Sequence, residues 1–252
     1  MISFSTTHLI LFFATAAFLC LSMWAVSKMN RVCQNIAFAF AALMCAGGIF
    51  YRYGLNFDIT NQVNIKTLAT QLLQVCNFNF ILVLLMLVPK FEPARQYSFM
   101  FSMFAASTTL VSVPSDWAAR AWNDAYVMNS WLNHTFAIAL PLWMFAARRL
   151  KPRKEYVWKV TVSVVVYFFI VAGMTEILRD RDVISPTKSF SFTHSPGGIP
   201  IFKWLYELIP VPCLYLLPMV PVMFGFFLLL AWAFRNYRVE PFAQAKTKKS
   251  NS

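Results

Sequence analysis

Seven stretches of this chain have the length and apolar character of helices that cross a membrane, and they constrain the fold more than any other feature. A crossing needs about 20 mostly apolar residues. With 59% hydrophobic and 13% charged residues, little chain is left for a separate soluble domain. The sequence therefore predicts one all-α membrane domain, residues 1–252, folded as a seven-transmembrane-helix bundle. The windows are 8–26, 33–51, 68–88, 97–113, 127–147, 156–177 and 212–234.

Two other interpretations of the apolar windows are disfavoured. The alternating ten-residue segments of a membrane β-barrel are absent from the sequence. The first window has no basic segment before it and no small-residue cleavage site after it, so we expect a retained helix and not a signal peptide.

Basic residues predict the orientation of the bundle, because loops rich in Lys and Arg stay on the cytoplasmic side. The loops after the first, third, fifth and seventh windows hold fourteen basic residues against three acids, Glu92, Glu155 and Glu240. We therefore expect the N-terminus outside and the C-terminus in the cytoplasm. The net charge of +12 reflects this topology, and we expect no nucleic acid as a partner.

Two segments outside the windows leave alternatives open. The stretch IPIFKWLYELI, between the sixth and seventh windows, fits a short helix lying in the outer interface or a plain loop. The basic tail, residues 246–252, is expected to be a disordered, solvated end, with contact to anionic headgroups as the alternative.

The cysteines show no ligand spacing, because no CxxC pair and no neighbouring His accompanies any of them. This pattern favours neither a metal site nor a disulfide framework, and we expect no cofactor. A haem held by His8 and His134 is the one cofactor alternative that the residue types allow. The five cysteines are Cys20, Cys33, Cys45, Cys76 and Cys213.

Polar groups inside the windows are the candidates for a site, since ionisable groups cost roughly 2.5–3.5 kcal/mol at membrane depth. The stretch QLLQVCNFNFILVLL carries Cys76 about 12 Å from the outer end of its window, at 1.5 Å per residue. The fifth window places His134 about 10 Å deep by the same rise. Glu176 and His8 lie near the outer ends of their windows. We expect these groups to meet in the outer half of the membrane.

At 100° per residue, the polar groups of this stretch divide between two helix faces. Gln71, Gln74 and Asn77 share one face, whereas Cys76 and Asn79 lie on the other. Because Gln74 points away from Cys76, a partner for the thiol is expected from another helix. His134 is the candidate for that partner.

Each of these residues also has a purely structural interpretation. A cysteine in an apolar helix commonly only packs, and Asn and Gln commonly join helices by hydrogen bonds. Asn133, beside His134, allows a structural hydrogen-bond network in the same way. Tyr215 has a hydroxyl that could serve a site, but no local pattern requires it.

The stretch QLLQVCNFNFILVLLMLVPK, followed by FSMFAASTTLVSVP, resembles the third and fourth helices of the YwaF family of bacterial membrane proteins, related to transmembrane protein 164. That family shows a Leu-Pro-Leu-His-x-Cys motif, whose Cys falls on Cys76, with Gln74 where the motif has His. The likeness continues through WLNHTFAIALPLWMFAARRL, which contains His134, and IPVPCLYLL, which contains Tyr215. It also reaches the early FSTTHLI with His8, but the family's Asn-Tyr pair after the sixth helix is absent.

The resemblance implies a membrane-embedded acyltransferase that acts on a phospholipid or lysolipid. Cys76 would carry the acyl chain as a thioester, and His134 would accept and return the proton. The amides of Gln74, Asn79 and Asn133 would donate hydrogen bonds to the oxyanion. The remaining polar candidates for this substrate site are His8, Glu176 and Tyr215.

Two rival functions belong to other classes. The chain could be a non-catalytic lipid-binding or assembly subunit of a membrane complex, with a partner membrane subunit, and Gln74 in the motif favours this alternative. A transporter is the second rival, since polar residues at membrane depth also mark substrate paths. No repeat with broken helices supports that second rival.

Overall fold

The structure is a computed structural model that describes residues 5–54, 72–88, 91–112, 119–197 and 199–239. Every regular element in these ranges is a helix. Four segments are long and apolar enough to cross a membrane: Thr6–Lys28, Arg31–Tyr51, Lys154–Asp180 and Leu214–Ala233. The expected class, an all-α integral membrane protein, is therefore confirmed by the length and composition of its helices.

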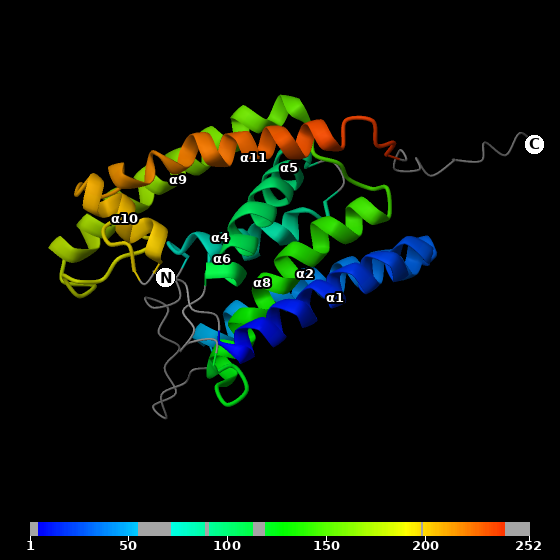
Figure 1. Ribbon diagram of the computed structural model, residues 1–252, viewed down its shortest axis with the longest axis horizontal. Helices are drawn as coiled ribbons and strands as arrows, with labels where there is room; N and C mark the ends of the chain where they lie inside the picture. The colour runs from blue at the N-terminus through cyan, green and yellow to red at the C-terminus, as the bar shows by residue number, and fades with distance from the viewer. Residues whose placement is uncertain (1–4, 55–71, 89–90, 113–118, 198, 240–252) are drawn as a thin grey trace, which may run out of the picture.

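The helices of the described ranges form an alternating, largely antiparallel arrangement (Figure 1). α8 is long enough to cross a membrane, but Asn129, Asn133 and His134 lower its mean hydropathy. The elements are α1 (Thr6–Lys28), α2 (Arg31–Gly54), α4 (Val75–Leu85), α5 (Glu92–Phe101), a π-helical turn η1 (Ser102–Ala106), α6 (Ser107–Ser112), α8 (Ala125–Ala146), α9 (Lys154–Asp180), α10 (Pro200–Leu208), a 3-10 turn η2 (Leu214–Leu216) and α11 (Met219–Ala233).

The bundle has two sides with a layer between them. α1 and α2 pack on α8 along one side, and α9 packs on α11 along the other, as Figure 1 shows. The continuous rod formed by α5, η1 and α6 lies between the two sides, together with the shorter α4. The short α10 lies at the end where α11 begins. The stretch IPIFKWLYELI thus contains a helix and is not a plain loop.

Three helices differ from their predicted windows. α4 begins at Val75, because residues 72–74 form a turn, and residues 68–71 of that window, Gln71 included, lie outside the described residues. α11 begins at Met219 after η2, since Pro212 and Pro218 interrupt the preceding chain. The rod of α5, η1 and α6 starts at Glu92, five residues before the predicted 97, and includes a π turn. The tail, residues 246–252, lies outside the described residues.

Small side chains allow α2 and α8 to pack closely. Ala41, Cys45 and Gly48 follow one another at helical spacing on α2, and both Ala41 and Cys45 are fully buried. The thiol of Cys45 donates to the backbone oxygen of Asn133, 3.8 Å away on α8. A Cβ atom built on Gly48 would lie 2.0 Å from the Asn133 side-chain oxygen. Glycine is therefore required where the amide of Asn133 crosses α2.

Buried polar groups join several elements at the opposite end from α10. Arg95, on α5, donates to the backbone oxygen of Arg149 at 2.8 Å and forms an ion pair with Glu92 at 3.2 Å. The amide of Gln96 donates to Glu92 and to the backbone oxygen of Lys151. Since Arg95 and Gln96 are almost fully buried, these bonds fix α5 to the turn between α8 and α9.

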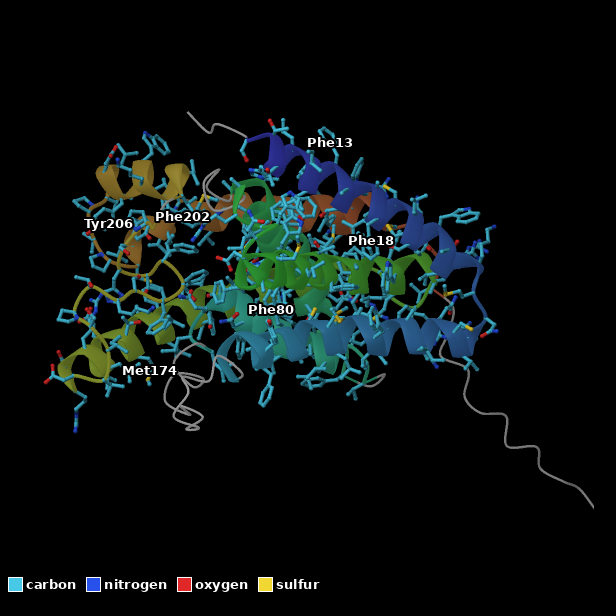
Figure 2. The ribbon with its side chains drawn as sticks, turned by 90° about the horizontal axis from the view of Figure 1, so that it is seen from below. Phe13, Phe18, Phe80, Met174, Phe202 and Tyr206 are labelled. Carbon is cyan, nitrogen blue, oxygen red and sulfur yellow. The ribbon has the colours of Figure 1, made fainter. Side chains whose placement is uncertain are left out.

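Large apolar side chains cover the outer surface of the long helices. On α1, Phe13 is 66% and Trp24 is 67% exposed, and Figure 2 shows Phe13 directed away from the bundle. Surfaces of this kind belong in lipid, where an exposed aromatic or aliphatic side chain carries no cost.

We expect Gly48→Ala to destabilise the protein by about 1–3 kcal/mol, because its new Cβ would overlap the amide of Asn133. Gly47→Ala is the matched control, since a Cβ at Gly47 meets nothing within 4 Å. Thermal unfolding in detergent, followed by tryptophan fluorescence, compares the two variants. Equal midpoints would show that Asn133 does not lie over Gly48.

Candidate functional site

Cys76 lies in the first turn of α4. The helix begins at Val75, and its first i→i−4 bond runs from the N–H of Phe78 to the oxygen of Gln74 at 3.0 Å. The N–H groups of Cys76 and Asn77 precede that bond, at the positive end of the helix dipole. An anionic sulfur or oxygen is favoured at such a helix end.

Cys76 also borders a partly open apolar cavity of about 120 Å³. Its walls are formed by α4, the rod of α5 to α6, α9 and α11, and the end near α10 is closed by Phe192, Ile199, Phe202 and the segment 213–217. Aromatic and aliphatic side chains make up most of the lining, among them Phe101, Phe168, Phe202 and Met223. Phe202 belongs to α10 and is labelled in Figure 2.

The polar atoms of the cavity wall are mostly turned into their own helices. The hydroxyls of Thr108 and Thr109 donate to backbone oxygens one turn earlier, at 2.6 and 2.9 Å. Cys213 is a second thiol on the lining and is buried. The space therefore suits a hydrocarbon chain, with sulfur as its reactive element.

His134 lies on α8 with its ring edge against Phe80, the two centroids 5.0 Å apart. Phe80 follows Cys76 by one helical turn of α4, and Figure 2 shows Phe80 within the bundle. The Nδ1 atom of His134 is 2.7 Å from the backbone oxygen of Ser130. Because a carbonyl only accepts, Nδ1 carries the hydrogen, and Nε2 of the neutral ring is the acceptor. His134 is not among the residues that line the cavity.

The two asparagines that were expected to donate to an oxyanion are engaged elsewhere. Asn79 donates from Nδ2 to the hydroxyl of Ser102, in the π turn, at 2.8 Å. Asn133 is 1% exposed and lies over Gly48. Neither residue lines the cavity, so both asparagines join helices in this structure.

His8, Glu176 and Tyr215 do not gather around Cys76. His8 donates from Nε2 to the backbone oxygen of Leu110 at 2.8 Å and packs against Trp131. Tyr215 is fully buried and its hydroxyl donates to the backbone oxygen of Phe192. Glu176 is exposed at the outer end of α9.

Gln74 is not directed at the cavity as an oxyanion donor. Its side-chain oxygen accepts the N–H of Ser191 at 2.9 Å. The hydroxyl of Ser191 in turn donates to the oxygen of Leu73 at 2.5 Å and accepts the N–H of Val75 at 2.7 Å. We call Leu73, Gln74, Val75 and Ser191 the Ser191 clasp. Spacing along the sequence could not reveal it, because 116 residues separate Val75 from Ser191.

His194 is a second group that the sequence analysis missed. Its Nε2 lies 2.5 Å from Glu176, and its Nδ1 lies 2.9 Å from the hydroxyl of Thr193. Burial lowers the pKa of His194, Arg179 lowers this pKa further, and Glu176 opposes both effects. The neutral ring therefore donates from Nε2 to Glu176. The cluster of Ser, Thr and His in FSFTHS, in a segment otherwise treated as a loop, was the available signal.

We expect acid to loosen the segment 190–194. Because folding lowers the pKa of His194, the unfolded chain binds the proton first, and stability present above about pH 6.5 is lost as the pH falls through the folded value. The protection factors of the amide hydrogens in this segment, which correct for the intrinsic pH dependence of exchange, should therefore fall between about pH 6.5 and 5. His194→Gln should remove the extra loss, since its amide still donates to Glu176. The same acid response in both proteins would contradict this assignment.

Comparison with known proteins agrees with a membrane protein of this kind. The sequence model of the TMEM164 family matches residues 3–230. No curated protein and no solved structure matches the chain. The match covers the four membrane-spanning segments almost completely, together with Cys76, His134 and the Ser191 clasp. This chain therefore belongs to the TMEM164 family.

Proposed function

We propose that the protein is a membrane-embedded acyltransferase that moves a fatty acyl chain between a phospholipid and a lysolipid through a thioester on Cys76. One observation carries the proposal: the thiol stands in the first turn of α4 on the wall of an apolar cavity. A hydrocarbon chain would fill the cavity, and its ester would reach the sulfur.

The start of α4 supplies the electrostatics that the reaction needs. A thiol attacks an ester as the thiolate, and the positive end of a helix stabilises that anion. The N–H groups of Cys76 and Asn77 would face the oxyanion of the tetrahedral intermediate. These backbone donors replace Asn79 and Asn133, whose amides are engaged between helices.

The reaction balances with the chain's own groups. The sulfur of Cys76 bonds to the ester carbon, the carbon–oxygen bond breaks, and the lysolipid leaves with the proton of the thiol. In the second half, the hydroxyl of an acceptor lysolipid attacks the thioester and returns its proton to the sulfur. No redox partner and no metal is required by these steps.

His134 is proposed to accept and return that proton. Its Nε2 has the acceptor form in the neutral ring, because Nδ1 donates to Ser130. Cys76 and Phe80, against which the ring packs, are four residues apart, or about 6 Å along α4. In this proposal, water carries the proton between the His134 ring and the thiol.

The proposed orientation places seven helices across the membrane, with the N-terminus outside and the C-terminus in the cytoplasm. Support comes from the basic loops and from the basic groups around Arg95 and Arg149 at the end opposite α10. The cavity then opens toward the outer leaflet. We also propose that the protein lies in a bacterial inner membrane and is related to the YwaF family. A partner membrane subunit is part of the same proposal.

Gln74 favours a second candidate function, lipid binding without catalysis. An amide cannot act as a base, and the side-chain oxygen of Gln74 already accepts from Ser191. In this alternative the cavity still holds a lipid chain, but no thioester forms. An acyl-transferring probe separates the two functions, since only the enzyme would become acylated on Cys76.

We expect Cys76→Ala to abolish exchange of labelled acyl chains between phospholipid and lysolipid in reconstituted vesicles, because it removes the group that carries the chain. Cys33→Ala is the matched control, since Cys33 is exposed on α2. Mass spectrometry of wild-type protein should find an acyl group on the peptide that contains Cys76. Undiminished exchange by Cys76→Ala would exclude this nucleophile.

We expect His134→Gln to slow the exchange by about 10²–10⁴-fold, the usual contribution of a general base, because an amide cannot take up the proton. The thermal midpoint, measured in parallel, shows whether the variant remains folded. If the His134→Gln variant is folded and exchanges acyl chains at the wild-type rate, His134 is not the base.

A further inference from the structure

Ser191 closes the start of α4 from a distant part of the chain. It is fully buried, and its hydroxyl and backbone N–H make three hydrogen bonds to consecutive residues, Leu73, Gln74 and Val75. The residue preceding α4, Gln74, makes no side-chain capping bond of its own. The hydroxyl of Ser191 therefore does for Val75 what a helix cap normally does from within the helix.

The backbone around Ser191 is held in a costly conformation. Ser191 has φ +50° and Phe192 has φ +62°, in the left-handed region that residues other than glycine adopt at a cost of about 1–3 kcal/mol each. Such conformations persist where the surroundings fix them, and they collect at functional sites. Here the two consecutive strained residues join the clasp to the cavity, because Ser191 belongs to the clasp and Phe192 is on the cavity wall.

Three tethers hold this strained segment in place. The hydroxyl of Tyr215 donates to the backbone oxygen of Phe192, and the N–H of Cys213 donates to the oxygen of Thr193 at 2.5 Å. His194 binds Glu176 on α9. The segment is thus fixed to α9 and to the chain before α11, and Ser191 transmits that fixed position to α4.

We infer that Ser191 is a positioning residue for Cys76, with Gln74 as its partner: the clasp holds the first turn of α4 so that its N–H groups converge on the thiol. The inference concerns the reactivity of the Cys76 sulfur. It rests on the proposed function only in explaining what that reactivity is used for. Without the Ser191 hydroxyl, Val75 loses its acceptor and the first turn opens. The thiolate then loses the helix end that favours it.

Alkylation of Cys76 by N-ethylmaleimide in the full-length detergent-solubilised protein tests the inference. Peptide mass spectrometry gives the initial rate, with exposed Cys33 as the internal reference. We expect Ser191→Ala to slow the alkylation of Cys76 by about tenfold at pH 7. This factor corresponds to ~1.4 kcal/mol, which is typical of a lost helix cap. Ser185→Ala, in an exposed turn of the same loop, should leave the rate unchanged.

The pH dependence distinguishes positioning from a general loss of structure. At about pH 9 a thiol ionises without help, so the tenfold difference between Ser191→Ala and wild type should shrink to about twofold or less. If the variant only disordered the site, the ratio of the Ser191→Ala rate to the wild-type rate would be the same at both pH values. A constant ratio, or no loss at pH 7, overturns the inference.

Two further variants keep the test decisive. Ser191→Gly relieves the positive φ but lacks the hydroxyl, so it should be as slow as Ser191→Ala; recovery to the wild-type rate would show that only strain matters. Gln74→Ala keeps the hydroxyl and removes the acceptor of the Ser191 N–H, so an intermediate loss is expected. If wild type fails to transfer acyl chains yet shows these alkylation rates, the proposed function fails and the positioning role stands.

Discussion

The buried N–H of Val75 must have a hydrogen-bond acceptor, and the organisation of the site depends on where that acceptor comes from. In an apolar interior an unsatisfied backbone group costs several kcal/mol, so a helix seldom begins there. Ser191 supplies the acceptor and α4 begins at Val75. Its neighbour Cys76 thereby occupies the first helical turn, where backbone N–H groups point outward and favour an anion.

The rest of the bundle makes this arrangement rigid at both ends. Close packing of α2 on α8 rests on small residues, and the buried bonds of Arg95 and Gln96 fix α5 to the α8–α9 turn. At the other end, the segment 190–194 is tied to α4, to α9 and to the chain before α11. Between these ends, α4, the α5–α6 rod, α9 and α11 leave an apolar space unfilled. The rigid ends explain how a cavity persists in a molecule with so many flexible apolar side chains.

Sequence reasoning predicted those features that depend on local composition. The long helices α1, α2 and α9 each contain a window that the apolar runs had indicated, because the length of an apolar run is written in consecutive residues. The start of α4 was not predictable in this way, since its cap comes from Ser191. The π turn at Ser102–Ala106 also leaves no local compositional signal.

The candidate site was predicted in part for the same reason. Cys76 could be singled out by its residue type and by the family resemblance, and it lies on the cavity wall. Asn79 and Asn133 share its membrane depth, yet their side chains turn toward Ser102 and Gly48. The depth of a residue along its helix follows from its residue number. The direction of its side chain depends on which helix packs opposite, and only the structure shows which helix that is.

Gln74 now has a physical role that the motif comparison alone did not provide. The resemblance places a His at this position in related proteins, and the replacement by Gln first indicated a lost base. In this chain the position faces the N–H of Ser191, and an amide oxygen accepts that bond in one protonation state at every pH. Under the proposed function, the proton of the thiol would then pass through another group. His134 has the required tautomer, and the hydroxyl of Tyr167 on α9, which donates to the backbone oxygen of Leu72 at 3.0 Å, lies at the same helix end. In the proposed acyltransferase the proton would therefore pass through His134 of α8, while residue 74 keeps the helix that carries the sulfur in place.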